Sequence, residues 1–393
     1  MTPPRVTIVQ RVMTHYRVPF FTALHDRLTA AGIHLDVIHG QPTADEATLG
    51  NSGALPGARV IRNHYLAVGP RSLCWQPCLG PTRTSDLVVV EQASRLLVNY
   101  ALLARRAIGG PAIAWWGHGR NLDPNGSSRL GEAIKRPLAR RSDWWFAYTT
   151  GTRAHLQSIG VPATRITVVQ NSTDTTAVAL RRSAIGPATR TRLRRSIKLG
   201  DGPVGVVLGS LYPAKRLGFV LDAANRIRDA VPDFQLVVIG DGPDRSLVDA
   251  AARSRPWVRV LGALTGDAMV DAAATGDVLL NPGLVGLAVL DAFALELPMI
   301  TIAGVHHSPE IEYLEDGENG IVLPRNTTAV GYAAAVAAVI GDDRELARLR
   351  AGCRDAAHRY TVQAMADNFA TGIQAALRLR VARSAGATGP ARG

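Results

Sequence analysis

Short runs of aliphatic and β-branched residues alternate along this chain with longer amphipathic segments, which is the pattern of βαβ units around parallel sheets. In the first half the runs predict strands at residues 6–10, 35–39, 87–91, 112–116, 144–148 and 166–170. The segments between them predict helices at residues 20–31, 94–108 and 129–140. We place this first α/β domain at residues 1–180.

A second series of the same kind follows residues 174–201, a polar stretch rich in arginine and threonine that we interpret as the passage between domains. Its predicted strands are 204–208, 235–239, 258–261, 278–281, 299–302 and 320–323, and its predicted helices are 216–230, 244–254, 266–274 and 288–295. We place this domain at residues 195–358. A last helix, 361–380, is expected to pack on the first domain, and the tail 384–393 is expected to be disordered.

The predicted fold class is therefore α/β, with two Rossmann-like domains that face each other across a cleft. Open α/β sheets bind ligands beyond the carboxyl ends of their strands, so the residues just after each strand are the candidates for a site.

The composition narrows the range of partners. The net charge of +12 comes mostly from arginine and attracts anions. No usual nucleic-acid-binding motif is present and aromatic residues make up only 5%, so no nucleic acid is expected. The basic cluster at 135–141, just before Trp144 and Trp145, suits a lipid-diphosphate acceptor or a peripheral membrane contact. A solvated helix followed by a buried strand is an equal alternative.

No stretch approaches the ~20 apolar residues of a membrane span, and the first strand begins too early for a signal peptide. The expected location is cytoplasmic, including the inner face of the plasma membrane. Neither the three cysteines nor the adjacent His306 and His307 form a zinc pattern, and the cysteines cannot form a disulfide framework. We expect no metal and no cofactor.

Two strand ends in the second half carry residues suited to an anion. Gly209 follows one strand, and Lys215 stands near the start of the next helix, where free amides and a cation converge. An exposed Lys-Arg pair on a first helical turn is the plainer alternative. Gly283 and Gly286 follow another strand and free the backbone to approach a phosphate.

Six short motifs occur in order along the second half. They are Gly-x-Leu with Lys-Arg within 209–216, Ile-Gly-Asp-Gly-Pro at 239–243, Val-x-Val-Leu-Gly at 258–262, Asp-Ala-Phe-Ala at 291–294, Leu-Pro at 297–298 and Asp-Gly-Glu-Asn-Gly at 316–320. This ordered set resembles the C-terminal domain of the GT4-type retaining glycosyltransferases (glycosyl transferases group 1), which have the GT-B fold. The resemblance spans residues 204–324.

The resemblance implies that Lys215 holds the donor diphosphate and takes part in catalysis. It also implies that loop amides near Gly286 contact the donor, that the turn near Gly262 binds the nucleobase, and that Glu310 binds hydroxyls of the sugar. The implied donor-binding residues are Gly209, Ser210, Lys215, Gly262, Leu264, Gly283, Val285, Gly286, Leu287, Asp291 and Glu310.

Three positions depart from the family pattern. Asp291 falls on the second acid of the family's Glu-x7-Glu motif, which binds the donor ribose, but the first acid falls on Gly283. Ser210 stands where a basic residue is expected, and Glu296 stands where the family usually has glycine before Leu-Pro. The motifs around residues 282–287 and 307–313 resemble a subgroup that lacks the first acid, so we favour an altered enzyme over an inactive one.

In the first domain, the same resemblance points to residues after two strands. His15 and Arg17 follow the first strand and are expected to meet the acceptor or a phosphate, as is Arg120. His118 lies between two glycines and is expected to act at the sugar as a catalytic residue. A turn histidine without a role is the alternative for His118.

The implied function is metal-independent transfer of a sugar, with retention, from a nucleotide-diphosphate sugar to a hydroxyl of a saccharide or lipid-linked acceptor. Cell-surface polysaccharide or glycolipid biosynthesis is the expected setting. A non-catalytic two-domain protein that binds nucleotide sugars is the alternative. An NAD-dependent dehydrogenase is disfavoured because no Gly-x-Gly-x-x-Gly follows the first strand.

Overall fold

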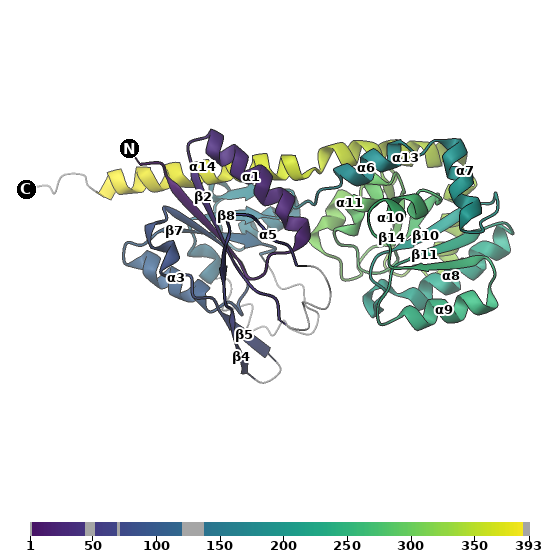
Figure 1. Ribbon diagram of the computed structural model, residues 1–393, viewed down its shortest axis with the longest axis horizontal. Helices are drawn as coiled ribbons and strands as arrows, with labels where there is room; N and C mark the ends of the chain where they lie inside the picture. Colours follow the sequence, from purple (N-terminus) through teal and green to yellow (C-terminus); the bar gives the residue numbers. More distant parts are fainter. Residues whose placement is uncertain (1, 44–51, 69–70, 120–136, 388–393) are drawn as a thin grey trace, which may run out of the picture. The chain divides into compact units, whose positions relative to one another are not determined.

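The computed structural model describes residues 2–43, 52–68, 71–119 and 137–387, and the chain divides into two compact units (Figure 1). The first unit comprises Met1–Asp174 and Val362–Gly393, and the second comprises Thr175–Thr361. Each unit is built on a parallel sheet with helices around it, which confirms the predicted α/β class.

The first unit has a seven-stranded sheet in the order β3-β2-β1-β6-β7-β8-β9. Its strands are β1 (Arg5–Gln10), β2 (His34–Gly40), β3 (Arg59–Ile61), β6 (Leu87–Glu91), β7 (Ala112–Gly117), β8 (Trp144–Ala147) and β9 (Ile166–Val168). All neighbouring pairs run parallel. The winding reverses between β1 and β6, so the loops after these two strands diverge at the carboxyl edge of the sheet.

Strand β3 and the antiparallel hairpin of β4 (His64–Val68) and β5 (Arg71–Trp75) were not predicted. The hairpin extends away from the main sheet in Figure 1. All five residues of β4 are exposed, so this strand has no buried face. Without a buried face, a strand lacks the alternation of apolar and polar residues by which sequence analysis detects it.

The helices of the first unit include one from the far end of the chain. They are α1 (Val18–Ala30), α3 (Val98–Ala107), α5 (Thr150–Ser158) and α14 (Val362–Ala387). Helix α14 packs along α1, and its Phe369 stacks on Phe146 with ring centroids 4.0 Å apart. Phe20 and Trp116 complete this aromatic cluster at 5.3 and 5.0 Å from Phe369.

Helix α14 continues to Ala387, so residues 384–387, which we expected to be disordered, are helical. The remainder of the expected tail lies outside the described residues. None of the helices in the described ranges combines the length and apolar character needed to cross a bilayer.

The second unit has a six-stranded sheet in the order β12-β11-β10-β13-β14-β15. Its strands are β10 (Val204–Leu208), β11 (Gln235–Ile239), β12 (Val258–Gly262), β13 (Val278–Leu280), β14 (Met299–Ile302) and β15 (Gly320–Leu323). Its helices are α6 (Thr176–Ser183), α7 (Pro187–Ser196), α8 (Leu217–Ala230), α9 (Arg245–Ser254), α10 (Gly266–Ala273), α11 (Ala288–Ala294), α12 (Ala329–Ile340) and α13 (Asp343–Arg359).

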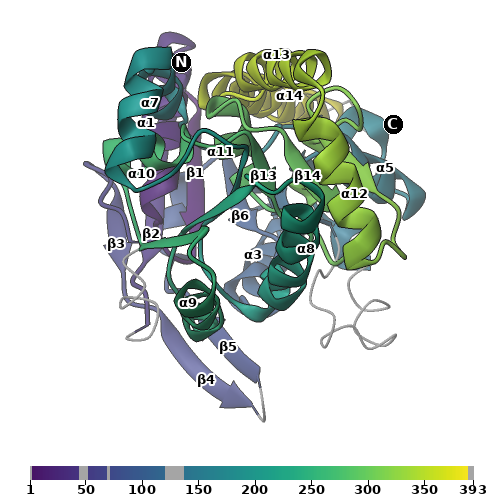
Figure 2. The same cartoon turned by 90° about the vertical axis from the view of Figure 1, so that its right-hand side faces the viewer.

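Helices cover both faces of this sheet (Figure 2). Val206 of β10 belongs to a core with Val289 of α11, whereas the next residue, Val207, belongs to a core with Val220 of α8. Successive side chains of a strand point to opposite faces, so each strand contributes to two cores. Burial on both faces explains why the strands of this unit are nearly continuous apolar runs.

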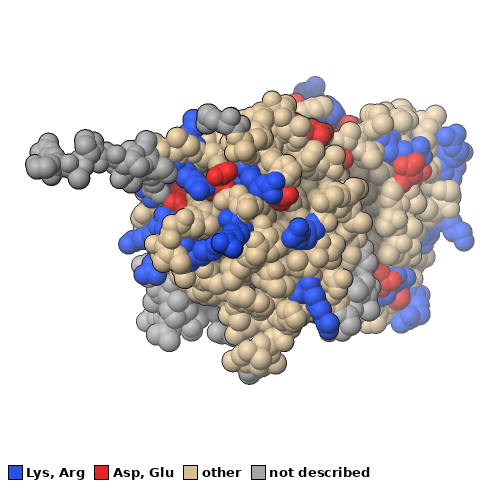
Figure 3. All heavy atoms as spheres, turned by 60° about the vertical axis from the view of Figure 1, so that its left-hand side comes forward, with Lys and Arg blue, Asp and Glu red and all other residues tan. Residues whose placement is uncertain are grey.

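The positive charge of the chain is partly on the surface and partly internal. Lys and Arg side chains, with Asp and Glu among them, are exposed on the face seen in Figure 3. In residues 174–201, which we interpreted as the passage between domains, Arg181 and Arg182 are half-buried and have partners within the second unit. Arg181 of α6 forms two hydrogen bonds of 2.7 Å with Asp271, and Arg182 donates to the Leu295 carbonyl at 3.0 Å.

Most of this stretch is therefore folded into the second unit as α6 and α7 rather than being a linker. Its arginine-rich composition resembles that of an exposed connection, but the guanidinium groups bind partners within the unit. This corrects our interpretation of the sequence.

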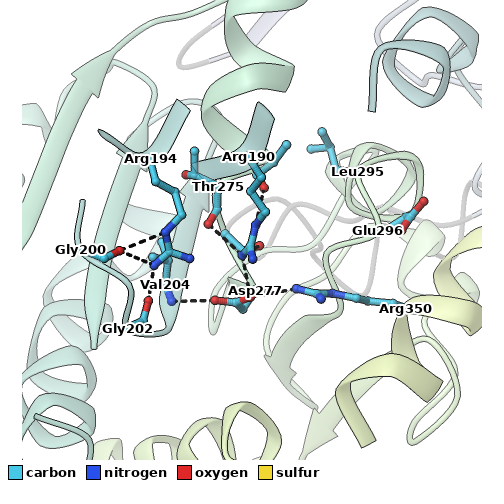
Figure 4. Close-up of polar contacts among 12 residues, drawn as sticks. Arg190, Arg194, Gly200, Gly202, Val204, Thr275, Asp277, Leu295, Glu296 and Arg350 are labelled. Atoms are coloured by element: carbon cyan, nitrogen blue, oxygen red, sulfur yellow. Dashed lines mark hydrogen bonds and ion pairs between the residues drawn. The ribbon is translucent and has the colours of Figure 1, made fainter. Parts of the chain in front are cut away.

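Asp277 is the centre of an ionic network at the amino end of the second sheet (Figure 4). Its Oδ1 accepts hydrogen bonds from Arg190 of α7 at 2.7 Å and from Arg350 of α13 at 2.9 Å. Its Oδ2 accepts from the Val204 amide at the start of β10 at 2.9 Å. Asp277 is only 9% exposed, so this carboxylate ties two helices to the central strand in a weakly solvated setting.

The substitution Asp277→Asn should lower the free energy of unfolding by about 3 kcal/mol, because it leaves two half-buried guanidinium groups opposite a neutral amide. Chemical denaturation of both proteins measures the difference. Asp222→Asn is the matched control, because Asp222 pairs with Arg226 on an exposed helix surface, where the loss should stay below about 0.5 kcal/mol. Equal losses in the two variants would contradict the role of Asp277.

Candidate functional site

The loops after β10, β13 and β14 lie along the carboxyl edge of the second sheet. Strand β10 lies between β11 and β13, and the winding of the sheet reverses between β10 and β13. Loops at such a reversal diverge and leave room for a ligand. The predicted Lys215, Gly283, Gly286 and Asp291 all follow these two strands.

Lys215 ends a single 3₁₀ turn, Pro213–Lys215, just before α8. Its side chain is half-buried, and burial lowers the pKa of the Lys215 ammonium to about 8. Within the described ranges no carboxylate forms an ion pair with it, and desolvation alone accounts for the shift. A cation that is desolvated without a counter-ion is suited to an anionic ligand.

The loop after β13 packs directly on the backbone next to Lys215. The Leu284 amide donates to the Ala214 carbonyl at 2.8 Å. A Cβ atom placed on Gly283 would lie 2.2 Å from that carbonyl oxygen and 2.7 Å from Cα of Lys215. No side chain fits at this position without displacing backbone, which is a physical reason for glycine where the family has its first acid.

The backbone amides of this loop divide into two groups. The Leu284 amide is bonded to Ala214, and the Val285 amide donates to Nδ1 of His307 at 3.0 Å. In the part of the chain that the structure describes, the amides of Gly286 and Leu287 have no acceptor. Of the loop residues predicted from sequence to bind the donor, Val285 therefore does not have a free N–H.

Asp291 lies on α11, the helix that follows this loop. Burial raises the pKa of the Asp291 carboxyl to about 6, and desolvation is the cause. Asp291 and Lys215 are thus two half-buried, desolvated groups of opposite charge at one edge of the sheet, and neither pKa shift has an ion-pair contribution. Desolvated ionisable groups with perturbed pKa values cluster at functional sites, so these two residues are candidates for one.

Five more of the predicted residues follow strands of the same edge or lie nearby. Gly209 has φ +104° directly after β10, and Ser210 beside it is exposed. Gly262 ends β12 with φ +78°, and Leu264 packs against the core on the α11 face. Glu310 is 2% exposed in the 3₁₀ turn Pro309–Tyr313.

Glu296, the third departure from the family pattern, has φ +55°, a conformation that normally favours glycine. Its carboxylate accepts hydrogen bonds from Arg354 at 3.1 Å and Arg182 at 3.4 Å. The left-handed backbone costs about 1 kcal/mol, and the two half-buried ion pairs offset that cost.

The predicted residues of the first unit lie near the carboxyl ends of its own strands. Arg17 is 6% exposed, and its guanidinium lies over the rings of Trp116 and Tyr148 at 4.9 and 5.9 Å from their centroids. His118 follows β7, with its ring 4.3 Å from that of Tyr148. His15 lies in a short 3₁₀ turn two residues before Arg17.

Arg17 is therefore enclosed by aromatic rings instead of standing on the surface, which the sequence did not indicate. Arg120, also predicted to contact acceptor or phosphate, lies outside the described residues.

Sequence reasoning did not assign a role to His307, which it considered only as a metal ligand beside His306. The described ranges contain no group of three or more His, Cys, Asp or Glu side chains arranged to hold a metal ion. No local sequence signal marks the contact that His307 makes, because its partner Val285 belongs to a different loop.

Comparison with known proteins identifies a matching family model, related enzymes and a solved structure with the same fold. A family model described as Glycosyl transferases group 1 matches residues 202–342. The chain is 29% identical over 283 residues to the GDP-mannose-dependent alpha-mannosyltransferase of Mycolicibacterium smegmatis. The aligned region covers 70% of this chain and 68% of that enzyme. The chain is also 27% identical over 145 residues to the alpha-monoglucosyldiacylglycerol synthase of Acholeplasma laidlawii. That aligned region covers 34% of this chain and 35% of that enzyme.

The fold is shared over almost the whole chain with a solved structure, Anabaena HepE (Alr3699) in complex with UDP. The TM-score is 0.68 at 16% sequence identity, and the match covers 94% of this chain and 99% of HepE. Residues 202–342 are therefore similar to the glycosyl transferases group 1 family, and the chain has the GT-B fold.

Proposed function

We propose that this protein transfers a sugar from a nucleoside-diphosphate sugar to a hydroxyl of a saccharide or lipid-linked acceptor, with retention of the anomeric configuration. The observation that carries the proposal is Lys215, a half-buried ammonium with which no carboxylate of the described residues forms an ion pair. It stands in the loop packed against the one that carries the unbonded amides of Gly286 and Leu287.

These groups suit the chemistry of a diphosphate leaving group. As the bond between the sugar and the diphosphate breaks, negative charge grows on the phosphate oxygen, and a cation and N–H groups fixed in advance stabilise it. The acceptor oxygen forms the new bond, and its proton passes to the departing phosphate. In this proposal Lys215 supplies the charge that a metal ion would otherwise supply, so the transfer needs no metal.

The other predicted residues have roles in the same proposal. Asp291 accepts hydrogen bonds from the donor ribose, and the turn at Gly262 and Leu264 binds the nucleobase. Glu310 binds hydroxyls of the sugar, and His118 acts next to the reacting carbon. His15, Arg17 and Arg120 serve the acceptor or its phosphate.

The relatives support this donor class. A GDP-mannose-dependent enzyme and a UDP complex are among the proteins similar to this chain, so UDP- and GDP-sugars are the donors to test first. The alpha-monoglucosyldiacylglycerol synthase supports a place in glycolipid or cell-surface polysaccharide synthesis. We further propose a cytoplasmic protein that acts at the inner face of the plasma membrane, where a net charge of +12 favours anionic lipid.

A second candidate function is binding of a nucleotide sugar without transfer. Gly283 favours it, because no acidic side chain can occupy that position. Incubation of the purified protein with a panel of UDP- and GDP-sugars and saccharide acceptors separates the two. Mass spectrometry should detect free UDP or GDP together with a product heavier by one sugar, whereas a binding protein would leave every donor intact.

The affinity of the wild type for UDP or GDP should fall as the pH rises through the pKa of Lys215, about 8, since the ammonium is lost there. We expect Kd to rise by about tenfold between pH 7.5 and 9, measured by calorimetry. The Lys215→Arg variant stays charged over this range and should lack this rise in Kd. Any change in Kd that it still shows measures the titration of the uracil or guanine base of the nucleotide. Lys215→Met should bind weakly at every pH. Wild-type binding that does not change over this range would contradict the role of Lys215.

Gly283→Ala should weaken nucleotide binding, because the added methyl group pushes the loop away from the backbone of Ala214 and Lys215. The free energy of unfolding should fall by about 1–3 kcal/mol. Gly331→Ala is the control, since a Cβ atom there meets ordinary contacts at 3.5 Å on an exposed helix surface. It should keep the nucleotide affinity, and because alanine favours a helix, its free energy of unfolding should stay the same or rise. Normal nucleotide affinity in Gly283→Ala would show that the loop does not bind the donor.

Transfer should persist in buffer that contains EDTA, because Lys215 and the loop amides balance the charge of the diphosphate. Activity that EDTA abolishes and that Mg²⁺ or Mn²⁺ restores would overturn the metal-independent form of the proposal.

A further inference from the structure

The ring of His307 connects two loops at the carboxyl edge of the second sheet. Its Nδ1 accepts a hydrogen bond from the Val285 amide at 3.0 Å, and its Nε2 bonds to the Ile302 carbonyl at 2.9 Å. A backbone N–H can only donate and a carbonyl can only accept. The imidazole is therefore neutral, with its proton on Nε2.

The surroundings of His307 maintain this neutral form. Burial lowers the pKa of the His307 imidazole, and the hydrogen bond to Ile302 opposes that shift only in part. The titratable group that acts on the ring is the neighbouring His306, an exposed residue whose charge would lower the pKa of His307 further.

The backbone of Val285 is held at both of its polar groups by the same segment. His307 accepts from its N–H, and the Ser308 amide donates to its carbonyl at 2.9 Å. On the other side of the loop, the Leu284 amide is bonded to the Ala214 carbonyl. The loop is thus clamped between the segment after β14 and the turn that contains Lys215.

The loop needs such a clamp because of its composition. Gly283 and Gly286 flank Leu284 and Val285, and glycine loses more conformational freedom on ordering than any other residue. The buried side chain of Val285 anchors the centre of the loop in the core. Hydrogen bonds to its backbone then set the orientation of the peptide groups that follow, at Gly286 and Leu287.

We propose that His307 is a positioning residue for nucleoside-diphosphate binding: its neutral imidazole fixes Val285 so that the unbonded amides of Gly286 and Leu287 face the phosphate. The role rests on the proposed function, because it assumes that these amides meet the donor. Protonation of Nδ1 would place two N–H donors against each other and release the loop from this side.

The test measures the affinity of UDP and GDP by calorimetry for the wild type and three variants. His307→Ala removes both ring contacts and should raise Kd about tenfold. His307→Asn places an amide oxygen near the position of Nδ1, so it should keep the Val285 contact and bind within about threefold of the wild type. His306→Ala, at the exposed neighbour, should not change Kd. Thermal unfolding without nucleotide verifies that each variant is folded.

The pH profile distinguishes positioning from a purely structural effect. Wild-type affinity should fall as the pH decreases through the lowered pKa of His307, whereas His307→Asn should lack that component. Asp291, with a pKa of about 6, and the nucleotide phosphates titrate in both proteins, so the difference between the two profiles isolates His307. Nitrogen NMR of the wild type should show the proton on Nε2 and a midpoint below that of a free imidazole.

Two failures have different meanings. If the wild type binds neither UDP nor GDP, the proposed function is wrong and the role of His307 is wrong with it. If the wild type binds and His307→Ala has the same affinity and pH profile, only the positioning role is overturned. A His307 imidazole that is protonated at neutral pH would also overturn it.

Discussion

The chain passes so close to itself at Gly283 that the backbone of Ala214 and Lys215 occupies the space of a side chain. This contact joins the loop after β13 to the turn after β10, and the hydrogen bond from Leu284 to Ala214 strengthens it. Most other properties of the site depend on this contact. It keeps the Lys215 turn against the sheet edge, and it leaves the next part of the loop to be held from its other side by His307 and Ser308.

The charged side chains at the two edges of the second sheet differ in whether they have partners within the fold. At the amino edge the buried Asp277 is surrounded by two guanidinium groups and an amide, so its charge is satisfied within the fold. At the carboxyl edge the half-buried Lys215 and Asp291 have no such partners among the described residues, and desolvation shifts the pKa of each group toward favouring its neutral form. Desolvation without compensation weakens the fold locally. The network at the amino edge compensates its charges within the fold, whereas the described residues do not compensate those of Lys215 and Asp291 at the carboxyl edge.

Much of the fold followed from the sequence alone. The six strands predicted in each half coincide with strands of the two parallel sheets, because strands buried on both faces are apolar runs bounded by turns. The sequence pattern did not predict strand β4, because that strand has no buried face. It did not predict helix α12 either, because the composition of α12 is almost uniformly apolar and lacks the alternation of apolar and polar faces. The N-cap of α13 was a signal that could have been used: the Asp342 side chain accepts hydrogen bonds from two amides of its first turn.

The sequence by itself determined which residues stand at the strand ends, and so it placed Lys215, Gly283 and Asp291 at one edge of a sheet. That much depends on periodicity and order, which are local properties of the chain. Only the tertiary structure decided what those residues are like: that Lys215 is desolvated, that no side chain fits at Gly283, and that the Val285 amide is bound by a histidine 22 positions away. These properties depend on contacts between loops that follow different strands, and no local pattern in the sequence records such contacts.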